Sequence, residues 1–187
     1  MDESDLKVET IDHRTEAKRA SAVVDERTTF EEFYAAEYRS LTTLARVLSG
    51  SSLHAEDIAQ EAMLAAFRRW EYVRGLDIPV TWVRRACANL ATSTIRRQAA
   101  EGRAMLRLRR QVRSDEPEKP LADPVFWAEV RKLPRRQAQC VALFYLYQCS
   151  VHETAVTLGC SDGTVKAHLS RARATLSERL SDTAEES

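Results

Sequence analysis

The sequence contains little glycine and proline and no long apolar run. Five glycines and five prolines in 187 residues argue against a turn-rich all-β fold and favour helices. No apolar segment approaches the ~20 residues that a membrane-spanning helix needs. The first thirty residues carry charges throughout, unlike a secretory signal. We therefore expect a helical, cytoplasmic protein without membrane insertion.

Net charge is also absent, because 28 basic residues balance 28 acidic ones. The balance conceals a segregation along the chain. Residues 1–80 hold ten basic and sixteen acidic residues, whereas residues 81–113 hold nine arginines and a single glutamate. A basic block suits phosphate and an acidic block suits a protein partner. For the acidic block, a merely solvated surface is the alternative.

Metal-binding and catalytic patterns are missing from the sequence. The four cysteines (Cys87, Cys140, Cys149 and Cys160) lack Cys-x-x-Cys spacing and have no histidines at zinc-finger intervals. Each lies in an apolar helical context, where packing as a small hydrophobe is favoured over redox sensing or metal binding. No Gly-rich phosphate loop, nucleophile elbow or His-Glu-x-x-His occurs. We expect no enzymatic activity, no metal and no cofactor.

Periodicity predicts an all-α fold of two small helical domains joined by a flexible linker. The expected parts are an extension at 1–29, a domain at 30–98, a linker at 99–123, a domain at 124–181 and an acidic tail at 182–187. The first domain should hold three helices: one from a cap at Thr28 or Thr29 to Gly50, one over 54–70, and one after a loop at 71–80 and a cap at Thr81.

The second domain is expected to contain a helix-turn-helix. After a short helix that stops at Pro134 and an apolar helix over 135–148, Ser150 and Glu153 form a capping box and Gly159 supplies a tight turn. A second capped helix follows, with an apolar stripe at Val165, Leu169, Ala172 and Leu176. Its outward side chains are short or polar at the N-terminal end and basic further on, which suits the major groove of DNA.

Three segments resemble sigma factors of the extracytoplasmic-function (ECF) group. AEDIAQEAMLAAFRRW (55–70) is similar to a region-2 helix in which an acidic residue precedes a glutamine by three, as Asp57 precedes Gln60. VRGLDIPVTWVRRACANLATSTIRR (73–97) is similar to the segment that melts promoters and recognises the minus-ten element. The segment from LPRRQ to GTVKAHLSRAR (133–173) resembles region 4, and all three follow the family's order.

The resemblance implies a non-enzymatic sigma factor that binds core RNA polymerase at its clamp and flap regions and directs promoter recognition and melting. It also implies promoter DNA and an anti-sigma factor as partners. The residues carried over for clamp binding are Asp57, Gln60, Glu61, Leu64 and Arg68. A polar strip around one exposed leucine is a reasonable docking surface. Without the resemblance, a solvated helix face would be preferred.

Two further sets of residues follow from the resemblance. Cations with amide and hydroxyl groups on one helix face suit a single strand, and a shaped pocket offsets the cost of extruding a base. The expected minus-ten residues are Arg74, Arg84, Arg85, Asn89, Thr92, Arg96 and Arg97. The expected minus-thirty-five residues are Ser161, Asp162, Gly163, Thr164, Lys166, Ala167, Ser170, Arg171 and Arg173. Ile78-Pro79-Val80 depart from the family's more polar or aromatic pattern, which leaves the captured base open.

A stand-alone helix-turn-helix regulator is the alternative interpretation. It explains residues 124–180 but leaves the domain at 30–98 without a role other than sensing or dimerisation. The two interpretations differ in whether promoter binding requires core polymerase.

Overall fold

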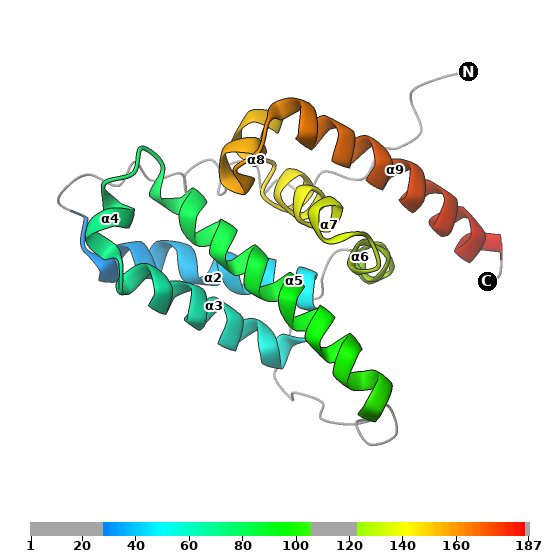
Figure 1. Ribbon diagram of the computed structural model, residues 1–187, viewed down its shortest axis with the longest axis horizontal. Helices are drawn as coiled ribbons and strands as arrows, with labels where there is room; N and C mark the ends of the chain where they lie inside the picture. Colours follow the sequence, from blue (N-terminus) through cyan, green and yellow to red (C-terminus); the bar gives the residue numbers. More distant parts are fainter. Residues whose placement is uncertain (1–27, 106–122, 186–187) are drawn as a thin grey trace.

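The computed structural model describes residues 28–105 and 123–185, without the side chains of Leu53, 94–105 and 182–185. Most of the expected extension and linker, and the expected tail's side chains, lie outside these residues. Every regular element in the described ranges is helical (Figure 1). The elements are α2 (Phe30–Ser49), α3 (Ser52–Phe67), α4 (Trp70–Arg74), α5 (Pro79–Met105), α6 (Pro124–Arg131), α7 (Arg135–Val141), η1 (Ala142–Leu146), α8 (Val151–Leu158) and α9 (Asp162–Glu185).

Helices α2, α3 and α5 form a bundle whose ends follow from local sequence. The Thr29 hydroxyl accepts the Glu32 N–H at 3.2 Å, and the Glu32 carboxylate accepts the Thr29 N–H at 2.9 Å, so the predicted capping box is confirmed. Gly50 ends α2 in the left-handed conformation with φ 72°. The Ser51 hydroxyl caps α3. These signals fix the turn that lets α2 and α3 pack against each other.

Helix α5 begins earlier and ends later than the sequence indicates. The prediction of a cap at Thr81 is wrong, because the helix begins at Pro79 and the Thr81 hydroxyl donates to the Ile78 carbonyl at 2.7 Å. Proline suits the first turn because the N–H that it lacks would be unpaired there. At the other end, α5 continues to Met105. The first residues of the expected linker are therefore helical.

The expected loop at 71–80 is also partly helical, because it contains most of α4. Val73 is fully buried in this short helix. Burial of this apolar side chain stabilises a short helical turn between Trp70 and Gly75. Five residues are too few for sequence periodicity to predict such a helix.

Helices α6 to α9 form the C-terminal unit, which contains the predicted helix-turn-helix. The Ser150 hydroxyl accepts the Glu153 N–H at 3.1 Å and the Glu153 carboxylate accepts the Ser150 N–H at 2.6 Å, which confirms the second capping box. Gly159 ends α8 with φ 65°. The predicted stripe of α9 is buried at Val165, Leu169, Ala172 and Leu176.

The single helix expected at 135–148 is divided in the structure. It begins as α7 and continues as the π-helix η1. After it, Gln148 has φ 51° and the Cys149 N–H donates to the Leu143 carbonyl at 3.2 Å. π-helical turns are rare in proteins, and those that occur often lie at functional sites. Here the irregular turn leads directly into Tyr147, whose hydroxyl reaches the Ser40 carbonyl on α2 at 2.7 Å.

The two units pack directly against each other. Helix α2 contacts α6 and η1, and α5 contacts α7 and α8; Figure 1 shows α7 and α8 beside α5, with α9 on the far side. The buried apolar side chains of both units belong to one cluster. The two units therefore share a core in this structure.

The four cysteines pack as small apolar side chains, as the sequence predicts. Cys87, Cys140 and Cys149 are buried free thiols, and Cys160 is half-buried and free. Burial raises the pKa of Cys87 to about 12, so its thiol stays protonated and unreactive. Among the described helices, none combines the length and apolar character that crossing a bilayer requires.

Replacing Ser150 by alanine should lower the free energy of unfolding by about 1 kcal/mol, because the first N–H groups of α8 lose their acceptor. Urea unfolding followed by circular dichroism measures the change. Ser177→Ala is the control, because Ser177 is an exposed residue in the interior of α9 and its replacement should stay within about 0.5 kcal/mol of the wild type. Equal stability of all three proteins would contradict the capping role.

Candidate functional site

The outward face of α3 has the composition that the sequence indicates. The inner face buries Ala55, Ile58, Ala62 and Ala66. The five predicted clamp-binding residues are all exposed: Asp57, Gln60, Glu61, Leu64 and Arg68. Leu64 is 46% exposed and is the large apolar residue of this strip. The structure therefore brings these five side chains to one accessible surface.

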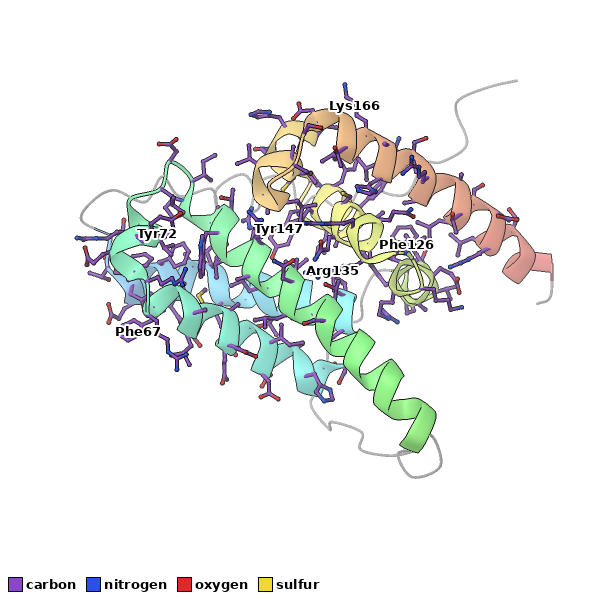
Figure 2. All side chains as sticks on the ribbon, viewed as in Figure 1. Phe67, Tyr72, Phe126, Arg135, Tyr147 and Lys166 are labelled. Atoms are coloured by element: carbon purple, nitrogen blue, oxygen red, sulfur yellow. The ribbon has the colours of Figure 1, made fainter. Side chains whose placement is uncertain are left out.

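An aromatic surface adjoins this strip, and sequence reasoning missed it. Phe67 is 56% exposed and Tyr72 is 59% exposed, and Figure 2 shows both at the edge of the N-terminal bundle. A shallow groove of about 520 Å³ lies between α2 and α3, lined by Phe30, Glu31, Tyr34, Gln60, Met63, Leu64 and Phe67. Large exposed aromatic side chains beside a polar strip are typical of protein-binding surfaces. The sequence does contain one indication of this surface: Phe67 follows Leu64 by three residues, so the two side chains lie on the same face of the helix.

The outward face of α9 is open to solvent along the predicted DNA-binding residues. The Ser161 hydroxyl accepts the Thr164 N–H at 3.2 Å and so caps the helix, as predicted. All nine predicted residues are exposed: Ser161, Asp162, Gly163, Thr164, Lys166, Ala167, Ser170, Arg171 and Arg173. Lys166 points away from the rest of the molecule (Figure 2). The Arg173 Nε donates to the Tyr145 hydroxyl at 2.9 Å, which fixes one cation of this face.

The polar face of α5 differs from the other two, because the C-terminal unit covers much of it. The Arg84 side chain is only 11% exposed, and Thr92 is 5% exposed. Asn89 is half-buried. Three residues predicted to contact the minus-ten strand therefore lie at the contact between the two units.

Tyr147 contacts two elements of the N-terminal unit (Figure 2). Its hydroxyl donates to the Ser40 carbonyl at 2.7 Å, and the Arg84 guanidinium carbon lies 4.3 Å from the centre of its ring. The Arg84 Nη2 also pairs with a Glu37 carboxylate oxygen at 3.3 Å. Burial raises the pKa of Glu37, and the nearby Arg84 cation opposes that rise. Burial likewise raises the pKa of Tyr147, so its hydroxyl remains a donor.

Gln139 on α7 makes the second polar contact with α5. Its side chain is fully buried, and its Nε2 lies 3.1 Å from the Ala88 carbonyl, 3.1 Å from the Asn89 Oδ1 and 3.2 Å from the Thr92 hydroxyl. The Arg135 Nη2 donates to the same Asn89 Oδ1 at 2.6 Å, and Figure 2 shows Arg135 beside α5. The side-chain oxygen of Asn89 and the hydroxyl of Thr92 thus accept hydrogen bonds from the C-terminal unit.

The other predicted minus-ten residues are dispersed. Arg85 is exposed, although its guanidinium lies so close to Gly159 that a Cβ there would be 2.6 Å from it. Arg74 pairs with Glu71 at 2.5 Å on the surface of α4. The side chains of Arg96 and Arg97 lie outside the described residues. The structure therefore places Arg84, Arg85, Asn89 and Thr92 against the C-terminal unit, whereas Arg74 pairs with Glu71 on α4.

Two family models match the chain over most of the described residues. The model for Sigma-70 region 2 matches residues 33–101, and the model for Sigma-70 region 4 matches residues 125–176. The first corresponds to the bundle of α2, α3 and α5, and the second corresponds to the unit that contains the helix-turn-helix.

Curated relatives match the chain along most of their length. The ECF RNA polymerase sigma factor SigM of Mycobacterium tuberculosis is 32% identical over 169 residues, which cover 86% of this chain and 82% of that protein. The RNA polymerase sigma-E factor of Streptomyces coelicolor is 30% identical over 151 residues, which cover 81% of this chain and 85% of that protein.

Two solved structures have a similar fold. The sigma factor RpoE, in complex with the anti-sigma factor NepR from Bartonella quintana, aligns with a TM-score of 0.62 and 23% identity, over 81% of this chain and 96% of its own. CnrH, in complex with the cytosolic domain of CnrY, aligns with a TM-score of 0.58 and 21% identity, over 90% of this chain and 97% of its own.

Replacing Glu37 by glutamine should change how stability depends on pH. Because burial raises the pKa of Glu37, the folded protein binds this proton more tightly than the unfolded chain does. The free energy of unfolding therefore falls as pH rises from the unfolded pKa through the folded pKa. Glutamine removes that contribution. The stability of the variant relative to the wild type should therefore rise as the pH increases above about 4, the ordinary pKa of a glutamate side chain.

Urea unfolding at several pH values tests this expectation. Glu178→Gln is the matched control, because Glu178 is exposed on α9, and its profile should run close to that of the wild type. Parallel profiles for Glu37→Gln and the wild type would refute the role of the buried carboxyl.

Proposed function

This chain belongs to the ECF group of RNA polymerase sigma factors, which are non-enzymatic, and we propose which of its surfaces meets each partner. Helix α3 docks on the clamp of core RNA polymerase, α5 holds the minus-ten strand, and α9 enters the major groove at the minus-thirty-five element. The C-terminal unit also contacts the polymerase flap. The protein acts in the cytoplasm, where polymerase and promoters are found.

Clamp docking is supported by the open face of α3. Leu64 and Phe67 are exposed apolar side chains within a strip of Asp57, Gln60 and Glu61. An apolar centre with a polar rim is the usual anatomy of a protein interface. This open strip, with Leu64 and Phe67 exposed beside polar side chains, is the single observation that carries the proposed docking on the clamp.

Duplex binding by α9 is supported by the exposure and chemistry of its outer face. Short side chains at Gly163 and Ala167 allow close approach to bases, and Lys166, Arg171 and Arg173 supply cations for phosphate. The buried opposite stripe holds the helix on its unit without using any of these groups. A helix held in this way suits the major groove.

Minus-ten binding by α5 is supported by the groups that its polar face presents. Arg84 and Arg85 are cations, and Asn89 and Thr92 offer an amide and a hydroxyl. Such a face neutralises phosphates and contacts exposed bases of a single strand. The apolar residues before it, Ile78 to Val80, leave the identity of the captured base undecided.

An anti-sigma factor is the remaining proposed partner. RpoE and CnrH, two proteins of similar fold, were solved with an anti-sigma factor and with the cytosolic domain of CnrY, respectively. We extend such a partnership to this chain. Affinity purification with the full-length protein would identify that partner.

The deciding experiment is run-off transcription with purified core polymerase and a library of upstream fragments from the source genome. Specific initiation should require this protein. Asp57→Ala combined with Gln60→Ala should reduce that initiation at least tenfold, because two of the polar groups that the α3 strip offers to the clamp are lost. Pull-down of core polymerase should fall in parallel.

Glu178→Ala is the control for the α3 variant, because it removes an exposed acidic side chain from a different surface and should transcribe normally. Direct duplex binding without any core-dependent initiation would instead identify a stand-alone regulator.

Lys166→Ala should weaken duplex binding at a promoter selected by that experiment, to a similar extent on specific and unrelated sequences. The slope of log affinity against log salt should become shallower by about one, because one phosphate contact is lost. Fluorescence anisotropy with holoenzyme at several salt concentrations measures both. Lys166→Arg keeps the cation and should retain the slope. An unchanged slope for Lys166→Ala would place Lys166 away from DNA.

A further inference from the structure

A tyrosine outside the helix-turn-helix contacts the outer face of α9. Tyr145 belongs to η1, and its hydroxyl accepts the Arg173 Nε–H at 2.9 Å. We propose that Tyr145 and Arg173 together form a binding site for one backbone phosphate of the minus-thirty-five duplex. The inference rests on the proposed function of α9. It adds a DNA contact from η1, which precedes the helix-turn-helix in the chain.

The hydrogen bond between these two side chains leaves donors unused on both of them. A phenol that accepts a hydrogen bond still has its own O–H to donate, and in the described part of the chain no acceptor is bonded to the Tyr145 O–H. A guanidinium has five N–H donors, and among the described residues only the Nε–H of Arg173 has a hydrogen-bond acceptor. A phosphate group offers only acceptors and a negative charge, so it fits this surplus of donors.

Aromatic rings hold both side chains in position. The Tyr145 ring lies 5.1 Å from the Phe144 ring and 6.2 Å from the Phe126 ring, centre to centre, and meets both nearly edge-on. Figure 2 shows Phe126 on α6, which packs beside α9. The Arg173 guanidinium carbon lies 5.6 Å from the centre of the Phe144 ring, within reach of a cation–π attraction. A cation held in this way loses little conformational freedom on binding a ligand.

The position of the pair on α9 favours the DNA backbone over a base edge. Lys166 and Arg173 are seven positions apart, about two turns of helix, so they lie on the same side of α9. Both are exposed, and Tyr145 is 44% exposed. Recognition helices read bases with residues of their N-terminal part, whereas Arg173 lies in the third turn or beyond. We therefore expect the pair to add affinity without discriminating between bases.

Tyr145→Phe removes the hydroxyl and keeps the ring that packs between Phe126 and Phe144. Holoenzyme with this variant should bind a promoter selected by run-off transcription roughly fivefold more weakly, because a hydrogen bond to phosphate is lost. The slope of log affinity against log salt should stay unchanged, since no cation is removed. Arg173→Ala should make that slope shallower by about one. Fluorescence anisotropy at several salt concentrations measures both quantities.

A double-mutant cycle tests whether the two side chains act as one site. Tyr145→Phe should cost little affinity in an Arg173→Ala background, since side chains that share one phosphate are not independent. In a Lys166→Ala background the loss should remain roughly fivefold, because separate contacts contribute additively. Arg173→Lys leaves the ring cluster intact and keeps the cation, but it lacks the Nε that bonds Tyr145. It should retain the salt slope and lose affinity.

Neutral methylphosphonate linkages, introduced one at a time through the minus-thirty-five element, identify the phosphate. One linkage should weaken binding by the wild type and by Lys166→Ala, yet weaken Tyr145→Phe and Arg173→Ala much less. A scan that finds no such linkage would overturn the inference, as would equal losses from Tyr145→Phe in the wild-type and Arg173→Ala backgrounds.

The outcomes also separate the inference from the function on which it rests. If Arg173→Ala weakens duplex binding and Tyr145→Phe does not, the shared site is wrong and the role of α9 stands. If Lys166→Ala, Arg173→Ala and Tyr145→Phe all bind like the wild type, the proposed role of α9 is itself wrong. Loss of affinity with both Tyr145→Phe and Arg173→Ala, coupled in the cycle and centred on one linkage, supports both.

Discussion

A helix face that carries cations and hydrogen-bonding groups is costly to bury without partners. This constraint applies to the contact between the two units. Helix α5 has one side in the core of its bundle, with Val83, Cys87 and Ala91 buried. Its polar side faces the C-terminal unit, which supplies an aromatic ring for Arg84 and an amide for Asn89 and Thr92. The packing of the two units combines this matching of polar groups with the apolar cluster that both units share.

The three candidate surfaces consequently have different accessibility. The α3 strip and the outer face of α9 are exposed, and they lie on elements whose opposite sides are buried within their own units. The polar face of α5, by contrast, is partly covered by the C-terminal unit. The surfaces proposed for polymerase and for duplex DNA are therefore exposed in this structure, whereas the surface proposed for the melted strand is partly covered.

Local chemistry explains which elements were predictable. Both capping boxes, the left-handed glycines Gly50 and Gly159, and the buried stripe of α9 depend on residues within a few positions of each other. Two of the failures depend on packing: Val73 is buried in the short α4, and the π-helix precedes Tyr147, whose hydroxyl donates to the Ser40 carbonyl on α2. The start of α5 at Pro79 has a local cause, because proline suits the first turn of a helix. Phe67 was missed because exposure cannot be deduced from an aromatic residue at the edge of an apolar stripe.

The all-helical class, the family and the residue types of the three surfaces were predictable before folding, because periodicity, caps and family motifs are local properties of the chain. The burial of Arg84, Asn89 and Thr92 beneath Gln139 and Tyr147 became visible only in the folded molecule. Tyr147 and Ser40 are separated by 107 positions, and Gln139 and Thr92 by 47. A polar residue carries no local mark of the group it will meet at such a separation, since that pairing follows from how two independently formed units fit together.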